Sequence, residues 1–136
     1  MTAVIKTVVG FDYGSYWTGI AVGQTLTGQA TPLRAVRSKD WPAIGKILHQ
    51  WQPQVLVVGL PLNMRGERQE MSARAERFAR QLEGRFGIRT EMIDEEGEKT
   101  ILSRADSEEK INDAVLVVEG AGLVRNEYGN RLFADA

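Results

Sequence analysis

Residues 8–22 read VVGFDYGSYWTGIAV, and this stretch decides the fold. A β-branched run from Val4 to Phe11 leads to one carboxylate, Asp12, and a second apolar run begins at Gly19. Two such runs joined by a turn predict a β-hairpin. Asp12 therefore ends or interrupts a buried strand, where a charge is costly without a partner. The residues alone leave two interpretations open: Asp12 is a metal-binding carboxylate, or it is a turn residue before Gly14.

Hydrophobic periodicity outside this hairpin predicts alternating helices and strands. The continuous apolar run Val55–Val58 is typical of a central strand that is buried on both faces. We expect it to lie beside and parallel to Val4–Phe11 in a five-stranded mixed sheet of an α/β protein, with helices on its faces. The expected elements are strands at Val4–Phe11, Gly19–Val22, Gln29–Val36, Val55–Val58 and Ile88–Ile93, and helices over Trp41–Trp51 (capped by Asp40), from near Ser72 to Gly87, and over Ile111–Val124 with Ile111, Val115 and Val118 inward.

The composition fits one domain spanning residues 1–136. Hydrophobic residues make up 43% of the chain and charged residues 26%, as in ordinary soluble proteins. No apolar run is long enough to span a membrane, and the absence of cysteine excludes disulfides and thiolate zinc sites. We expect a cytoplasmic protein that is a monomer or weak dimer. The net charge of −1 means that any nucleic acid must be bound by a local basic patch.

The segment that follows the predicted central strand carries a second group of candidates. The chain leaves the sheet at Gly59-Leu60-Pro61, and ligand crevices usually lie at the carboxyl ends of such strands. Arg74 and Arg77 share a helix face, and guanidinium groups match phosphate geometry. Nearby glutamates favour a merely solvated face on charge alone, and Asn63 can equally form a simple turn. The candidate nucleic-acid-binding residues are Asn63, Arg65, Arg68, Arg74 and Arg77.

Carboxylates gather where the predicted fifth strand ends. Asp94, Glu95 and Glu96 are consecutive there, and Asp113 opens the last predicted helix. Clustered carboxylates suit a divalent cation with oxygen ligands, although acidic loops without function are common. Asp113 can also simply favour a helix N-terminus. The single histidine, His49, fits a surface or packing residue better than a ligand. An all-oxygen site for Mg²⁺ or Mn²⁺ is therefore the metal site that this sequence can most readily build.

The motifs GFDYGS, TGQATPL, GLPLNM and RAERFARQL together resemble the RuvX (YqgF) family, distant relatives of the RuvC Holliday junction resolvases. The resemblance covers most of the chain, and GLPLNM at residues 59–64 is its most specific block. It implies an RNase H-like fold and metal-dependent hydrolysis of phosphodiester bonds, in processing the 5′ end of pre-16S rRNA. It also implies that Asp12, Glu95 and Asp113 are catalytic and hold Mg²⁺ or Mn²⁺. The implied partners are pre-rRNA or branched DNA, and ribosomal precursor particles.

Three positions depart from the family pattern. Tyr16-Trp17-Thr18 stands where the family carries a basic residue, and Arg65 replaces an aspartate. The family has a motif after the fifth strand that begins with Asp-Glu. Residues Glu96–Thr100 differ from the rest of this motif, which predicts that activity is impaired. A catalytically weak RNA-binding assembly factor is therefore one alternative, and a Holliday-junction-type DNA resolvase is another. A nucleotide-binding fragment of the actin and sugar-kinase type is a third alternative, which the short chain argues against.

Overall fold

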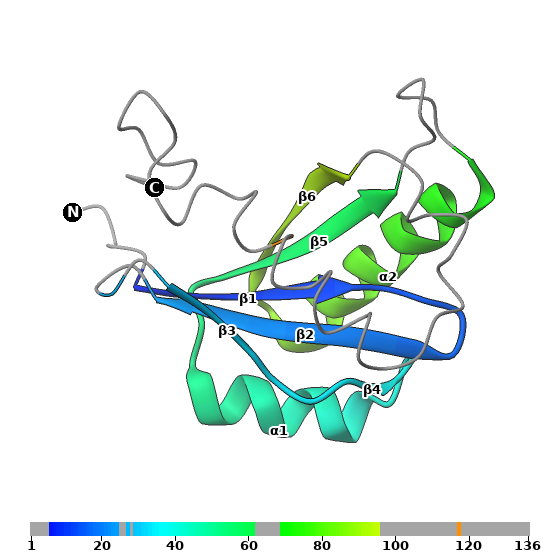
Figure 1. Cartoon of the computed structure of the whole chain (residues 1–136). Coiled ribbons are helices and arrows are strands. Elements are labelled where there is room, and N and C mark those ends of the chain that lie inside the picture. The colour runs from blue at the N-terminus through cyan, green and yellow to red at the C-terminus, as the bar shows by residue number, and fades with distance from the viewer. Residues whose placement is uncertain (1–5, 25–26, 28, 62–68, 96–116, 118–136) are drawn as a thin grey trace, which may run out of the picture.

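A mixed sheet with two helices on one face forms the body of the protein (Figure 1). The computed structural model describes residues 6–24, 27, 29–61, 69–95 and 117. The strands pair in the order β3-β2-β1-β5-β6, and β4 pairs with β2 off this path. The elements are β1 (Thr7–Asp12), β2 (Trp17–Gln24), β3 (Gln29–Pro32), β4 (Val36–Arg37), α1 (Trp41–Trp51), β5 (Val55–Pro61), α2 (Glu70–Phe86) and β6 (Arg89–Glu95).

The centre of the sheet is built as the two apolar runs predict. β1 pairs antiparallel with β2 and parallel with β5, and β5 pairs parallel with β6. Phe11 lies opposite Ile20 on one side and Val58 on the other. Every residue of β1 is buried, as expected for a strand that has neighbours on both sides and packing on both faces. The predicted hairpin and the parallel central pair are both confirmed.

The predicted third strand, Gln29–Val36, is divided in two. β3 ends at Pro32, and the two-residue strand β4 begins four residues later, opposite Trp17 and Thr18. Proline has no N–H to donate to a ladder, so pairing weakens at that residue. The chain stays close to β2, because the Leu33 N–H donates to the Ile20 carbonyl at 2.9 Å. The five predicted strands are thus present, with β4 as a short addition.

Each of the two helices begins and ends at residues that favour a helix terminus. The Asp40 carboxylate accepts the Ala43 N–H at 3.2 Å and caps α1. α2 begins two residues before Ser72, whose hydroxyl accepts the Gln69 N–H at 3.0 Å. Gly87 ends α2 with φ of 65°, a conformation that glycine adopts without strain. The first two of the three predicted helices are therefore confirmed in position.

The two faces of the sheet carry separate hydrophobic clusters. On one face, alternate strand residues such as Phe11 pack with α1 and α2, and the Phe78 ring lies 5.7 Å from the Phe11 ring. On the other face, Val8, Val57 and their neighbours pack against Val117. Val117 is helical and 3% exposed, so the second face is covered there. The rest of the predicted helix Ile111–Val124 lies outside the described residues.

Val117 differs from the inward residues that periodicity predicted for the last helix, which were Ile111, Val115 and Val118. The apolar run at 115–118 reads VLVV, so it offers more than one apolar stripe to the sheet. A helical period cannot select one stripe from such a run, because every position in it is apolar. Val117 is buried against the sheet, and the predicted inward residues Ile111, Val115 and Val118 lie outside the described residues.

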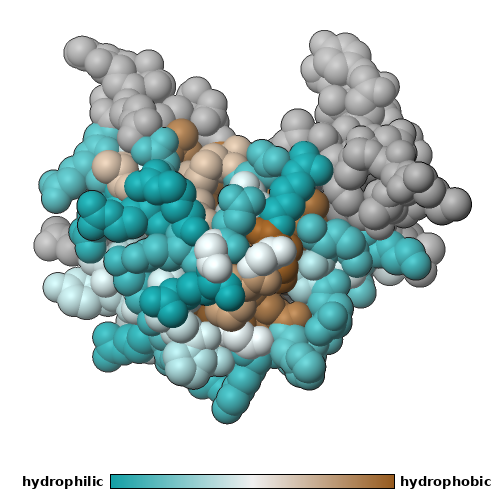
Figure 2. Space-filling model, turned by 180° about the vertical axis from the view of Figure 1, so that it is seen from behind, coloured by the Kyte–Doolittle hydropathy of each residue, from teal (hydrophilic) through white to brown (hydrophobic). Residues whose placement is uncertain are grey.

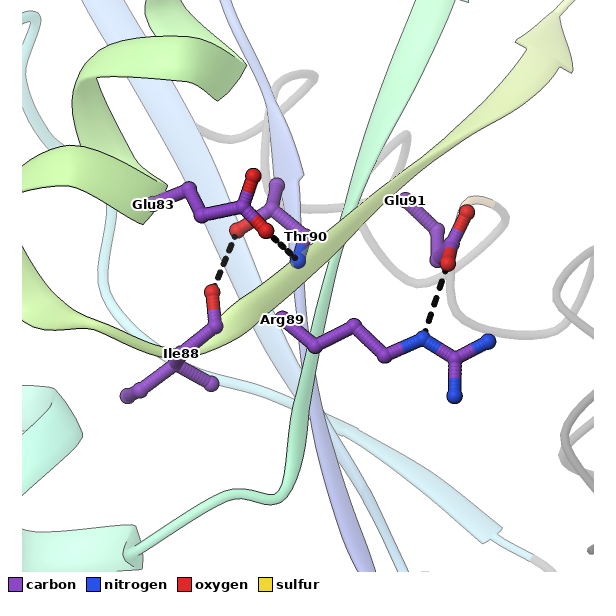
Figure 3. Close-up of polar contacts among 5 residues, drawn as sticks. All are labelled: Glu83, Ile88, Arg89, Thr90 and Glu91. Carbon is purple, nitrogen blue, oxygen red and sulfur yellow. Dashed lines mark hydrogen bonds and ion pairs between the residues drawn. The ribbon is translucent and has the colours of Figure 1, made fainter. Parts of the chain in front are cut away.

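Short contacts fix the start of β6 (Figure 3). The Glu83 carboxylate, from α2, accepts the Thr90 N–H at 3.3 Å, and the Thr90 hydroxyl donates to the Ile88 carbonyl at 3.0 Å. Arg89 and Glu91 form an exposed ion pair at 2.8 Å, of a kind that contributes little stability. The register of β6 is that of its parallel pairing with β5, which runs from Arg89 opposite Val55 to Glu95 opposite Pro61.

One face of the molecule, seen from behind, is mainly polar: hydrophilic side chains surround a smaller hydrophobic area (Figure 2). Among the described residues, Tyr16 is the one large hydrophobic side chain that is exposed, at 62%. Neither described helix is long and apolar enough to cross a membrane.

Candidate functional site

Asp12 is the last residue of the central strand β1, and it is only 7% exposed. Its backbone pairs with Gly19, so it belongs to the ladder and not to the turn that follows. Side chains alternate along a strand, so Asp12 shares a face with Val8, the face that Val117 covers. Asp12 therefore ends a buried strand, as predicted, and its role as a metal-binding carboxylate stays a prediction.

Glycines flank Asp12 on both neighbouring strands. Gly19 is its direct partner on β2, and Gly59 comes next after the paired residues Phe11 and Val58 on β5. Residues at the same level of adjacent strands share a face. Neither neighbour therefore places a side chain beside the Asp12 carboxylate. Glycines beside a carboxylate are typical of sites where a phosphate or a cation approaches the backbone closely.

The carboxyl ends of three parallel strands meet at the edge where Asp12 lies. β1 ends at Asp12, and β5 and β6 end together, with Leu60 opposite Asp94 and Pro61 opposite Glu95. The last residue of β6, Glu95, therefore lies at the same edge of the sheet as Asp12, two strands away, and neighbouring strands are about 4.8 Å apart.

The loop after Asp12 is held from two directions. The Ser38 hydroxyl donates to the Gly14 carbonyl and lies 2.9 Å from the hydroxyl of Thr18, which is fully buried. The Ser38 N–H also donates to the Tyr16 carbonyl at 2.9 Å. Sequence reasoning missed Ser38, because a contact across 24 residues leaves no local pattern. Ser38 keeps the exit from Asp12 in one conformation.

The predicted phosphate-binding residues are described only in part. Arg74 is exposed on α2, and its Nη1 donates to the Ser15 hydroxyl at 3.2 Å, on the loop that follows Asp12. Arg77 is also exposed on α2. Asn63, Arg65, Arg68 and Asp113 lie outside the described residues, as does the altered segment Glu96–Thr100.

The metal-binding prediction rests on position alone. Within the described part of the chain, no three His, Cys, Asp or Glu side chains form a cluster that could hold a metal ion. Asp113 lies outside the described residues, and only the backbone of Glu95 is described. The remaining candidate, His49, is exposed on α1, in agreement with a surface role.

The strand order, the parallel and antiparallel pairing and the carboxylate at the end of β1 define the class: an α/β protein of RNase H-like fold. The RuvC resolvase of Thermus thermophilus, solved in complex with a Holliday junction substrate, shares this fold. Its TM-score is 0.54 at 15% identity, over 87% of this chain and 93% of that one.

Within this class, the chain belongs to the RuvX family. Residues 6–114 match that family, which is described as Holliday junction resolvase. A relative from Aeromonas hydrophila subsp. hydrophila is 51% identical over 94 residues, which cover 66% of this chain and 67% of the relative. A relative from Colwellia psychrerythraea is 44% identical over 110 residues, which cover 78% of this chain and 71% of the relative. Both relatives carry the name "Putative pre-16S rRNA nuclease".

Proposed function

We propose that this protein is a metal-dependent nuclease that hydrolyses phosphodiester bonds while the 5′ end of pre-16S rRNA is processed. The substrate comes from the name that its relatives carry. The observation that supports the chemistry is Asp12 itself, a buried carboxylate on a central strand with glycines beside it at Gly19 and Gly59. Its setting would be a cytoplasmic ribosomal precursor particle.

Asp12, Glu95 and Asp113 would hold Mg²⁺ or Mn²⁺. Bound divalent ions stabilise charge on both the attacking and the leaving oxygen of an in-line displacement. Asp12 would be the central ligand, because a strand paired on both sides holds a carboxylate more precisely than a loop does. Asp113 precedes the buried Val117 by four residues, and such residues share a helix face. That spacing would direct Asp113 to the Asp12 face of the sheet.

Arg74 would position the substrate. Its contact with Ser15 places a guanidinium group beside the loop that leaves Asp12, where it can pair with a phosphate. Arg77 lies three residues further along the same helix and would contact the next part of the nucleic-acid strand. Asn63, Arg65 and Arg68 complete the proposed nucleic-acid-binding set from the segment that follows β5.

The test is cleavage by the wild type and by Asp12→Asn, with Mg²⁺ or Mn²⁺ and with chelator. The substrates are an RNA that spans the 5′ end of pre-16S rRNA and a branched DNA. We expect cleavage of the RNA by the wild type alone, because the change keeps the side-chain shape but removes the charge that holds the metal. Glu95→Gln should be similarly inactive, whereas Glu91→Gln, earlier on the same face of β6, should be active.

Three outcomes would contradict parts of this proposal. Equal activity in Asp12→Asn, or activity that survives chelation, would refute the metal mechanism. Cleavage of branched DNA in preference to RNA would favour a resolvase. RNA binding without any cleavage by the wild type would favour the assembly factor, with the altered segment Glu96–Thr100 as the suspected cause.

A further inference from the structure

A second feature lies on the other side of the β1–β2 loop, where the segment around β4 faces α1. A cavity of about 560 Å³ opens there, and its walls come from the start of β2, residues 34–37 and the first half of α1. Three cationic side chains line it, Arg34, Arg37 and Lys46, and all three residues are exposed. The proposed cleavage chemistry does not use this groove.

The charge of the groove is strongly biased for a chain whose net charge is −1. Asp40 is the one carboxylate among its lining residues, and it already accepts the Ala43 N–H as the cap of α1. Three cations therefore face one partly engaged anion. A local patch of this kind is what an otherwise neutral protein needs in order to bind a polyanion.

Aromatic side chains accompany the cations. The Arg37 guanidinium stacks on the Trp17 ring, 4.7 Å from its centroid. Tyr16, the preceding residue, is 62% exposed. Trp17 is half-buried, so Tyr16 is the exposed ring of the two. An exposed aromatic ring near a cationic groove is typical of proteins that bind single-stranded nucleic acid, because bases stack on such rings while cations contact the phosphates.

The groove is joined to the candidate site by short, direct contacts. Trp17 opposes Arg37 in the β2–β4 pairing, so the strand that follows the Asp12 loop forms a wall of the groove. Ser38, the residue after Arg37, bonds to the loop at Gly14 and Tyr16. The groove and the loop that follows Asp12 are therefore neighbouring parts of the molecule, connected through Trp17 and Ser38.

We propose that this groove binds the phosphates of a single-stranded RNA segment that flanks the bond held at Asp12, and that a base of this segment stacks on Tyr16. The proposal rests on the proposed function and names an additional surface for the same substrate. A neutral peptide would leave the three cations without matching charges, whereas the consecutive phosphates of a nucleic-acid strand would match them.

The experiment measures RNA binding apart from cleavage. Oligoribonucleotides of about 4 and about 16 nucleotides are titrated by fluorescence anisotropy over a range of salt concentrations, with chelator present. The test variant is Arg34→Gln/Arg37→Gln/Lys46→Gln. The control, Lys6→Gln/Arg80→Gln/Arg85→Gln, removes equal charge and also one stacked guanidinium, since Arg85 lies 4.4 Å from the Trp41 centroid. Circular dichroism checks that both variants are folded.

Each phosphate contact on a single strand contributes about 0.7 to the slope of log affinity against log salt, so three lost contacts should lower it by about 2. At about 0.1 M salt, that corresponds to binding of the longer RNA weakened by about 100-fold. The control should bind within about twofold of the wild type, because its changes leave the groove intact. Tyr16→Ser should weaken binding without changing the salt slope, because stacking releases no counterions.

Three results would overturn the proposal: equal losses in both triple variants, an unchanged salt slope in the groove variant, or a wild type that binds neither RNA. Failure of the proposed function is a separate result. If the wild type never cleaves RNA but the groove variant loses binding as described, RNA binding by the groove is supported and the nuclease proposal is refuted. If cleavage depends on Asp12 and the groove variant binds normally, the nuclease proposal is supported and RNA binding by the groove is refuted.

Discussion

At the scale of single residues, the surroundings of Asp12 are more informative than Asp12 itself. An aspartate followed by a glycine two positions later is common in turns, and the sequence left that interpretation open. The structure adds that Asp12 pairs with Gly19 and lies level with Gly59, so that this buried carboxylate lies between two strand positions without side chains. A local pattern shows the chain neighbours of a residue, but it does not show its neighbours on adjacent strands.

Ser38 gives a prediction at this scale. Ser38→Ala removes hydroxyl contacts to Gly14 and to the buried Thr18. Loss of such contacts costs about 1–3 kcal/mol of unfolding free energy, because buried polar groups are left unsatisfied. We also expect slower cleavage, since the loop next to Asp12 becomes less ordered. Urea unfolding and steady-state kinetics measure both effects.

Ser15→Ala is the matched control for Ser38→Ala. It removes a hydroxyl from the same loop, but its contact to Arg74 is exposed and should contribute little to stability. If the two variants unfold at the same urea concentration, Ser38 does not hold the loop in the way described here.

At the scale of elements, the two helices were predictable because their signals are local. Asp40 precedes an apolar stripe as a cap, and Gly87 follows one in the left-handed conformation that ends α2. The division of the third strand was less predictable, because Pro32 signals an edge but not the return of the chain to β2 at Val36. The groove was not predictable, since Arg34, Arg37 and Lys46 come together only when β4 lies beside α1.

Two glycines of α2 provide the prediction for this scale. Gly84 lies inside the helix, and an added Cβ would meet nothing within 4 Å. Gly84→Ala should therefore raise the free energy of unfolding by about 0.5–1 kcal/mol, because alanine loses less backbone entropy in a helix.

Gly87→Ala is the paired variant, with the same added methyl group and equally open space. Its φ of 65° is strained for alanine, so we expect a loss of about 1 kcal/mol instead of a gain. Thermal and urea unfolding of the two variants check the opposite signs. Two changes of the same sign would show that the end of α2 is not determined by this left-handed residue.

At the scale of the whole molecule, the fold brings together groups that are distant in sequence. The parallel arrangement of β1, β5 and β6 puts Asp12 and Glu95 at one edge, although 82 residues separate them in the sequence. Periodicity predicted the strands and the parallel pairing of the two central ones, whereas the joint role of Asp12 and Glu95 was implied by the family resemblance alone. Periodicity does not reveal which residues of different strands share an edge, because it reports only the local repeat of apolar positions.

The whole-molecule prediction concerns stability in the presence of metal. A ligand that binds only the native state raises the free energy of unfolding by RT ln(1 + [L]/Kd), about 2.7 kcal/mol at a concentration of 100 times Kd. Mn²⁺ should therefore raise the Tm of the wild type by several degrees, since about 1 kcal/mol corresponds to at least about 2 °C for a chain of this size.

Asp12→Asn should show little or no rise in Tm, because the central metal ligand has lost its charge. Glu91→Gln should respond like the wild type, because Glu91 pairs with Arg89 at the other end of β6. Calorimetric scans with Mn²⁺, with Ca²⁺ and with chelator make the comparison without any substrate. A similar rise in the wild type and in Asp12→Asn would place the ion elsewhere on the protein, and the carboxylates at this edge of the sheet would then need another role.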